Sequence, residues 1–334
     1  MAKKYSGKKV SEKDIKSFYR KNKNNKPMLI AAALIFAAVV YFTGGDILDT
    51  TDSAAMQTAA DLAASLNDSN NEAAPNRTPT TVMDDGKLMV MVQDVGQGDS
   101  ILIKTPEKAV LIDASESPYS DVILENIENA GIDKLDLVIA THAHSDHIGG
   151  MRKVITNVEV DEIVISPTPH TTSTYQKLLE AIDSEGIKLH IADPGMTFDM
   201  GDGAVFTIIG PADDFEDLND SSVITRLDFG ECSFLFSGDA ELPAEQAVLA
   251  SGMDINVDMM TAAHHGSSTS TGDAYLRAAS PEYLSISCGT GNDYGHPHRE
   301  TIQKLQGYTV NRTDLEGDIT YLCDGSRIEV TTEK

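Results

Sequence analysis

Three histidines and one aspartate fall within six residues, directly after an apolar run of the length of a buried strand. The run covers residues 135–140, and the polar cluster that follows consists of His142, His144, Asp146 and His147. Bulky polar groups at the end of a buried strand cost free energy unless something binds them. Imidazole nitrogens and carboxylate oxygens are ligands of zinc and, with more oxygen, of manganese. The cluster therefore predicts a metal site, in which the two earlier histidines serve one position and the Asp-His pair a second.

Charge divides the chain into a basic tip and an acidic body. Residues 1–27 hold ten basic and two acidic residues, a net charge of +8, whereas the rest holds 16 basic and 50 acidic residues, a net charge of −34. An acidic body repels phosphate backbones, which argues against non-specific nucleic-acid binding through a basic patch. A phosphate-bearing substrate would therefore have to be held by a metal ion or by local dipoles.

An apolar segment, residues 28–42, follows the basic tip. It is shorter than the roughly 20 residues of a typical spanning helix, but a short span is feasible if Lys26 extends its charge to the interface. The positive flank predicts a cytoplasmic tail (1–27), a transmembrane signal anchor (28–45) and an extracytoplasmic remainder. A cleaved signal peptide, which would give a secreted protein, is the alternative, although residues 40–42 are bulky for a cleavage site. A buried core helix is a third reading.

The residues beyond the apolar segment fall into a linker and a folded domain. Residues 46–87 are rich in Asp, Asn, Ser, Thr and Ala, which predicts a disordered acidic and polar linker. From Leu88 onward, strand-like and helix-like patterns alternate, with a hairpin expected around residues 229–231. This mixture predicts one α/β domain over residues 88–334, with two sheets covered by helices.

The chain has three cysteines, Cys232, Cys288 and Cys323, with no CxxC spacing. An odd number of cysteines cannot be fully paired within one chain. Cys232 and Cys288 lie in apolar runs, so we expect them to be small buried side chains. Neither a disulfide framework nor a cysteine-based zinc site is expected.

Four motifs resemble those of the metallo-β-lactamase superfamily, and they occur in the family's order. The polar cluster matches the signature HxHxDH. Asp113 resembles the aspartate that supports the metal loop from behind, and Asp239, in a Gly-Asp pair, resembles the carboxylate that bridges two metals. His264 and His265 resemble the later histidine motif. One of these two histidines is expected to bind metal, and the other could contact substrate.

The resemblance covers residues 88–334 and implies an αββα sandwich, which is two mixed sheets flanked by helices. It also implies two divalent metal ions, with zinc expected first and manganese as the alternative. The superfamily's usual histidine before the Gly-Asp pair is missing, because residues 219–222 read Asn-Asp-Ser-Ser. Asp220 or a water molecule is therefore expected to complete the first metal position. Asp99 is expected to steady the metal loop.

Further stretches of the chain indicate a narrower resemblance. They are VGQGDS (95–100), HHGS (264–267), YGHPH (294–298) and RTD (312–314). Together they are similar to the soluble hydrolase domain of ComEC-type competence proteins, which take up DNA. That domain is thought to degrade the strand left outside. With one candidate span, this chain is expected to have a membrane-channel partner rather than to be the pore. Many such loops carry Asp where this chain has His144, and the fuller histidine set favours zinc.

These motifs predict an extracytoplasmic, metal-dependent phosphodiesterase or nuclease, with single-stranded DNA as a candidate substrate. In the mechanism that the resemblance implies, a hydroxide held by the metals attacks the phosphodiester in line. Asp146 then counts both as a ligand and as a catalytic residue, while His296 and His298 could protonate the leaving group or hold a phosphate. Asn292 and Tyr294 are candidate hydrogen-bond donors to the substrate.

Two other functions are compatible with the same residues. The first is hydrolysis of another ester or amide, such as a cell-wall or lipid phosphoester like phosphorylcholine, or a β-lactam. The second is a non-catalytic metal-binding module that docks a membrane channel. Metal bound without hydrolysis of any ester would favour the second.

Overall fold

The computed structural model describes residues 86–334. The predicted cytoplasmic tail, the signal anchor and all but the end of the linker lie outside the described residues. Within the described part, no helix combines the length and apolar character that a membrane span needs. Strand β1 begins at Leu88, where the sequence pattern changes.

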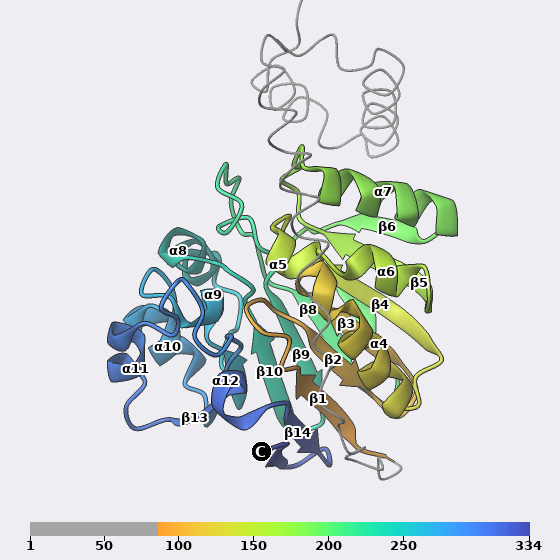
Figure 1. The fold of residues 1–334 in the computed structure, drawn as a ribbon. Helices are drawn as coiled ribbons and strands as arrows, with labels where there is room; N and C mark the ends of the chain where they lie inside the picture. The colour runs from red at the N-terminus through yellow and green to blue at the C-terminus, as the bar shows by residue number, and fades with distance from the viewer. Residues whose placement is uncertain (1–85) are drawn as a thin grey trace, which may run out of the picture. The chain divides into compact units, whose positions relative to one another are not determined.

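Eight strands form the first sheet, in the order β15-β14-β1-β2-β3-β4-β5-β6 (Figure 1). Neighbours from β3 to β6 pair in parallel, and the others pair antiparallel. Parallel neighbours need a crossover, so the chain passes over the sheet between them. The strands are β1 (Leu88–Val92), β2 (Ile101–Lys104), β3 (Ala109–Ile112), β4 (Lys134–Ala140), β5 (Glu159–Ile165), β6 (Lys188–Ile191), β14 (Ile319–Cys323) and β15 (Ile328–Thr332).

Seven strands form the second sheet, in the order β13-β12-β11-β10-β9-β8-β7. Pairs from β10 to β13 are parallel, and pairs from β7 to β10 are antiparallel. The predicted hairpin is confirmed, since Phe229 of β9 pairs with Cys232 of β10. The strands are β7 (Thr197–Asp199), β8 (Val205–Ile208), β9 (Thr225–Phe229), β10 (Cys232–Phe236), β11 (Met259–Thr261), β12 (Tyr283–Ile286) and β13 (Thr309–Arg312).

Helices cover the outer face of each sheet (Figure 1). Ile123 and Ile127 of α4, one helical turn apart, are both buried against the first sheet. On this side lie α4 (Ser120–Asn129), α5 (Ser145–Ile148), α6 (Met151–Ile155) and α7 (Ser173–Glu185). The second sheet carries α8 (Leu242–Ser251), α10 (Asp273–Ala279) and α11 (Arg299–Lys304). Short turns at strand ends are α9 (Ala263–Gly266) and α12 (Thr313–Glu316).

The two sheets enclose a core of their own, in which Phe206, Phe234 and Tyr321 are fully buried. Separate apolar clusters fill the space between each sheet and its helices. The order of layers is therefore helices, sheet, sheet, helices. This order confirms the predicted sandwich of two mixed sheets flanked by helices.

A disulfide joins Cys232 of β10 to Cys323 of β14, with 6.6 Å between the Cα atoms. The expectation of an unpaired Cys232 and of no disulfide was therefore wrong. The two cysteines are 91 residues apart in the sequence, and both lie in the core between the sheets. They meet because their strands belong to facing sheets, which no local pattern reveals. Cys288 is buried and free, as expected.

Candidate metal centre

The predicted metal-binding residues lie in loops at strand ends. His142 and His144 follow β4, and Asp113 follows its parallel neighbour β3. Asp239 follows β10, and the two later histidines lie in α9, after the parallel neighbour β11. Parallel neighbours end at the same edge of a sheet, so each sheet contributes two adjacent loops. The site forms where the loops of the two sheets meet.

Several of these residues have uncommon backbone conformations. Asp113, His264 and His265 have φ angles of 57°, 54° and 55°, in the left-handed region that residues other than glycine rarely adopt. Gly98 has a φ of 140°, and a Cβ there would lie 2.3 Å from the carbonyl oxygen of Asp146. Such conformations persist only where the surroundings enforce them, and they cluster at functional sites.

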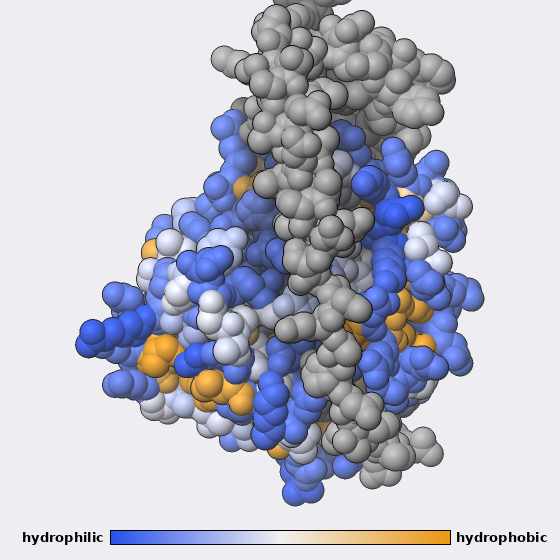
Figure 2. Space-filling view, viewed as in Figure 1, coloured by the Kyte–Doolittle hydropathy of each residue, from blue (hydrophilic) through white to orange (hydrophobic). Residues whose placement is uncertain are grey.

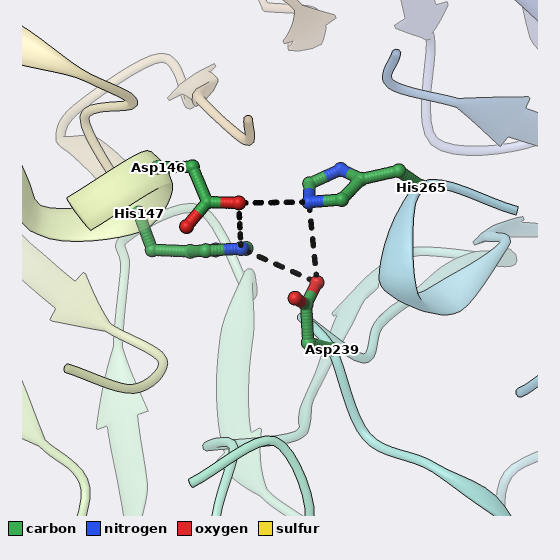
Figure 3. Close-up of side chains that lie close together, drawn as sticks. All are labelled: Asp146, His147, Asp239 and His265. Atoms are coloured by element: carbon green, nitrogen blue, oxygen red, sulfur yellow. Dashed lines mark ion pairs between the residues drawn. The ribbon is translucent and has the colours of Figure 1, made fainter. Parts of the chain in front are cut away.

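Four side chains form the first ligand group, Asp146, His147, Asp239 and His265 (Figure 3). The Asp239 Oδ1 atom lies 3.2 Å from His147 Nε2 and 3.5 Å from His265 Nε2. The Asp146 Oδ2 atom lies 3.5 Å from His265 Nε2 and 4.0 Å from His147 Nε2. Two carboxylates and two imidazoles thus converge on one point.

Hydrogen bonds determine which ring nitrogen of each histidine faces that point. His147 Nδ1 lies 2.7 Å from Asp113 Oδ2, and His265 Nδ1 lies 3.1 Å from the carbonyl oxygen of Ser287. Carboxylate and carbonyl oxygens only accept, so Nδ1 carries the proton in both rings. Nε2 of each ring therefore faces the convergence point, and a metal ion that binds there would replace any proton held by Nε2. Orientation of metal-binding histidines through the far nitrogen is usual at metal sites.

The convergence point fits a divalent metal ion. His147 Nε2, His265 Nε2 and Asp239 Oδ1 are buried and have no hydrogen-bond partner. Buried polar atoms without a partner are rare and costly in proteins. Three such atoms within 4.8 Å of one another are explained if a cation binds all of them.

A second ligand group contains His142, His144 and the other oxygen of Asp239. His142 Nε2 lies 2.9 Å from His144 Nδ1 and 3.7 Å from Asp239 Oδ2. The Thr141 hydroxyl donates to Asp113 Oδ2, so its oxygen can accept a hydrogen bond from the Nδ1–H of His142 at 3.1 Å. That arrangement leaves the His142 Nε2 lone pair available. Asp239 therefore offers one oxygen to each group, which is the geometry of a bridging carboxylate.

The structure distinguishes the two adjacent histidines. His265 is buried in the first group, with its Nδ1 also 3.3 Å from Asp99 Oδ1. His264 Nε2 lies 3.7 Å from Asp239 Oδ2, and its Nδ1 lies 3.2 Å from Glu241 Oε1. His264 is thus on the side of the second group. The Asp99 carboxylate thus contacts His265, and its role in steadying the metal loop stays a prediction.

Asp220 is placed apart from both ligand groups. Its Oδ1 accepts a hydrogen bond from the backbone N–H of Ala244 in α8, at 3.3 Å. Ser222 lies at the second group instead, because its hydroxyl is 3.4 Å from His142 Nδ1 and accepts from the Asp239 N–H at 3.2 Å. Within residues 86–334, the loop that lacks the usual histidine therefore contributes a serine to this group.

Burial and charge act in opposite directions on the central carboxylate. Burial raises the pKa of Asp239, but the charges of His147 and His265 outweigh it and hold the pKa well below its usual range. Burial also raises the pKa of Asp113, because it outweighs the charge of His147 and the hydrogen bonds from His147 and Thr141, which lower it. Asp239 is therefore an anion at neutral pH and suits a cation.

The loop that carries the remaining predicted residues is closed by Asn292. Its Nδ2 donates to the carbonyl oxygens of Gly289 and His296, at 2.8 and 2.6 Å, and its Oδ1 accepts from the His296 N–H at 2.9 Å. These bonds engage both ends of the amide. Asn292 therefore shapes the loop, and its expected contact with substrate stays a prediction.

His296 and His298 both accept hydrogen bonds at Nδ1. The Ser268 N–H donates to His298 Nδ1 at 2.9 Å. The Gln97 Oε1 accepts from the Gly289 N–H, which directs the Gln97 Nε2 to His296 Nδ1 at 3.4 Å. In its neutral form, each ring therefore carries its proton on Nε2. Burial lowers the pKa of His296 to about 4, and the charges of His265 and His264 act in the same direction.

Sequence reasoning missed Glu241, Ser222 and Ser287. Glu241 and Ser222 each lie within three residues of a predicted ligand, Asp239 or Asp220. Their position close to a predicted ligand is the only sequence feature that could have indicated these two residues. Ser287 acts through its backbone carbonyl, which carries no sequence signature.

We expect Asp113→Asn to weaken zinc binding about 10- to 100-fold, because Asp113 orients His147 from behind. Its two oxygens accept from Thr141 N–H, Thr141 O–H and His147 Nδ1–H. Asparagine has one oxygen and one NH₂, so at least one donor would face another donor. Competition with a chromophoric chelator measures the affinity. Asp136→Asn is the matched control, because Asp136 also accepts a backbone N–H but lies away from the centre. An unchanged affinity in Asp113→Asn would contradict the orienting role.

Glu245 anchors the segment that follows the two adjacent histidines. Its carboxylate accepts the N–H groups of Thr271 and Gly272, and burial outweighs these donors and raises its pKa to about 7. The folded state thus holds the proton more tightly than the unfolded state, whose pKa is near 4.5. This difference in pKa contributes about 3 kcal/mol to the unfolding free energy below about pH 4.5. The contribution is lost as the pH rises through about 7.

The test compares unfolding free energies of the wild type and Glu245→Gln from about pH 5 to 8. We expect the wild type to lose stability relative to the variant as the pH rises. Glu180→Gln, at an exposed position of α7, should show a constant difference from the wild type. A constant difference for Glu245→Gln as well would contradict the prediction.

The fold and the two ligand groups define a class of protein, the metal-dependent hydrolases with two facing sheets. Residues 93–289 match the family model of the metallo-β-lactamase superfamily. The chain belongs to this superfamily, and the resemblance that its motifs indicated is confirmed.

The chain is related to competence proteins. It is 31% identical over 248 residues to ComE operon protein 3 of Bacillus subtilis, covering 68% of this chain and 32% of the relative. It is 29% identical over 243 residues to competence protein ComA of Neisseria gonorrhoeae, covering 71% and 32%. The chain thus spans about a third of the length of these curated relatives. The metallo-β-lactamase fold protein YhfI of Bacillus subtilis matches with a TM-score of 0.45 and 14% identity, over 71% of this chain and 100% of that one.

Proposed function

We propose that this protein is a two-metal phosphodiesterase that cleaves single-stranded DNA on the outer side of the cytoplasmic membrane. The observation that carries the proposal is the position of Asp239 between two ligand groups, with one oxygen turned to each. Two-metal sites suit displacement at phosphorus, where both the attacking and the leaving oxygen need stabilisation. The relation to competence proteins supports DNA as the substrate class.

Different side chains would bind the metal ions and the substrate. When bound, two divalent ions would lower the pKa of a water molecule to about 7 and neutralise charge on the phosphoryl oxygens. His142, His144 and Asp239 would hold one ion, and the first ligand group the other. The four imidazoles favour zinc over manganese. Asp113 keeps His147 in the tautomer that binds metal.

His296 and His298 are suited to the substrate rather than to the metals. Each carries its proton on Nε2, because Nδ1 accepts from Gln97 or from the Ser268 N–H. A neutral imidazole N–H can donate a hydrogen bond to a phosphoryl oxygen, whereas protonation of the leaving oxygen would require the imidazolium form. The loop thus supplies hydrogen-bond donors beside a site that otherwise supplies carboxylates and lone pairs.

The disulfide supports an extracytoplasmic location. Cys232 and Cys323 are paired in the core, and such bonds persist mainly in oxidising compartments. We propose that residues 28–45 anchor the chain with its N-terminus in the cytoplasm and that a membrane channel is its partner. Protease accessibility of the domain in intact cells, compared with lysed cells, tests the topology. Protection in intact cells would contradict it.

The function is tested with the full chain, loaded with Zn²⁺ or Mn²⁺, on end-labelled single-stranded DNA. We expect cleavage that depends on metal and is absent from a chelator-treated sample. Folded, metal-loaded protein that cleaves no strand would contradict the nuclease proposal.

A small phosphoester is the second candidate substrate, and one observation favours it. Residues 86–334 hold 42 acidic and 15 basic residues, and the face drawn in Figure 2 is mostly hydrophilic. A net charge of −27 repels a long polyanion more than a small substrate. Turnover of a chromogenic phosphodiester without any DNA cleavage would favour this reading.

A further inference from the structure

Tyr294 presents an accessible aromatic ring beside the metal centre. It is 67% exposed, the most exposed of the large hydrophobic residues within residues 86–334. One face of its ring lies near the His296 ring, with centroids 5.7 Å apart and planes inclined by 19°. The His296 ring lies 5.5 Å from that of His264 and 6.0 Å from that of His265. A single imidazole therefore separates Tyr294 from the histidines of the centre.

Hydrogen bonds hold this pair of rings in place without any ligand. Asn292 ties the backbone on both sides of Tyr294 through the Gly289 carbonyl and the N–H and C=O of His296. Gln97, oriented by the Gly289 N–H, contacts His296 on its Nδ1 edge. The stacked rings of Tyr294 and His296 are thus largely preorganised, which reduces the conformational entropy that is lost when a ligand binds.

The charge of the domain determines what kind of contact a DNA strand needs. The described residues carry a net charge of −27, so the phosphate backbone gains little attraction outside the metal centre. Affinity must then come from contacts that do not depend on charge. A base stacked on an aromatic side chain contributes about 1–3 kcal/mol and does so for every base, because each has a π face.

We propose that the outer face of Tyr294 binds one unpaired nucleobase of the strand whose phosphodiester lies at the metal centre. The ring is stacked beside that of His296, with centroids 5.7 Å apart, and the residue is 67% exposed, so the ring is accessible to a base. The inference rests on the proposed function and adds to it a base-binding subsite. Bases in a duplex are stacked on each other, so the subsite selects single strands without reading their sequence.

The test uses the zinc-loaded full chain and two labelled strands of equal length, one of thymidine nucleotides and one wholly abasic. Both carry the same backbone charge, so their difference in affinity isolates the bases. Stopped-flow anisotropy reads binding before turnover. We expect the wild type to bind the thymidine strand about 5- to 150-fold more tightly than the abasic strand. Tyr294→Ala should abolish this preference, whereas Tyr294→Phe, which keeps the ring, should retain it.

Leu315→Ala is the control, because it removes another exposed apolar side chain, 60% exposed, and should leave the preference in place. A purely structural role of Tyr294 would change the affinity for both strands equally and leave their ratio constant. Equal binding of the two strands by the wild type, or a preference that survives in Tyr294→Ala, would overturn the inference. A preference that depends on Tyr294 without cleavage of either strand would support the subsite and contradict the nuclease proposal.

Discussion

In the proposed two-zinc phosphodiesterase, Asp239→Asn should lose bound zinc at both positions and lower the rate of hydrolysis by at least about 10³-fold. One oxygen of Asp239 faces His147 and His265, and the other faces His142 and His264. Asparagine keeps the shape but removes the negative charge and one acceptor, so neither ligand group retains its shared anion. Elemental analysis of the dialysed protein gives the zinc content per chain, and turnover of the labelled strand gives the rate.

Asp220→Asn is the matched control for this experiment. Asp220 is also a buried aspartate, and the sequence pattern predicts it as a ligand, yet it accepts from the Ala244 N–H in α8. The amide oxygen of asparagine can keep that hydrogen bond, so zinc content and rate should remain near those of the wild type. Full zinc content in Asp239→Asn would show that the bridging residue has been assigned incorrectly. Loss of one zinc ion in Asp220→Asn would show that Asp220 is a ligand after all.

Removing the disulfide by the double change Cys232→Ala and Cys323→Ala should reduce the unfolding free energy substantially. The bond closes a segment of 91 residues. In the chain-entropy description, a closure of this length contributes about 4–5 kcal/mol through the unfolded state, although typical measured values are about 2–4 kcal/mol. Urea unfolding followed by far-ultraviolet circular dichroism, with and without reductant, measures the change.

Cys288→Ala separates this effect from the loss of a buried sulfur. Cys288 is buried and free, and its Sγ contacts Asp314 rather than another sulfur. The single variant should keep the wild type's sensitivity to reductant, whereas the double variant should have none. Equal stability of the oxidised and reduced wild type would show that the disulfide contributes nothing to folding.

The elements of the fold were largely predictable, because their signals are local. The apolar run at residues 135–140 became β4, and the turn at residues 229–231 became the β9-β10 hairpin. The single turn of α5 was not foreseen, since four residues are too few to show a helical period. The sheet order, in which β14 lies beside β1, depends on pairing between distant segments. No window of sequence contains both partners of such a pair.

The candidate site was likewise predictable where the signals are local and unpredictable where contacts join distant segments. His142 and His147 could be named in advance because dense polar residues after a buried strand have few explanations other than a ligand. Asp239 was named because its Gly-Asp pair resembles the superfamily's motif. The assignment of His265 to one ligand group and His264 to the side of Glu241 required backbone angles and neighbours from other loops. The role of Asn292 could not be predicted from the sequence, since an amide in a glycine-rich loop can contact either substrate or backbone.

Residue identities and their spacing along the chain were sufficient to indicate the family, a ligand set suited to a divalent metal and a position at strand ends. They act through hydrophobic periodicity and ligand chemistry, which are properties of short segments. The packing of the two sheets then placed Cys232 against Cys323, Ser222 rather than Asp220 beside His142, and His296 beside His264 and His265. Each of these contacts joins two loops or strands, and its distance follows from how the whole chain packs.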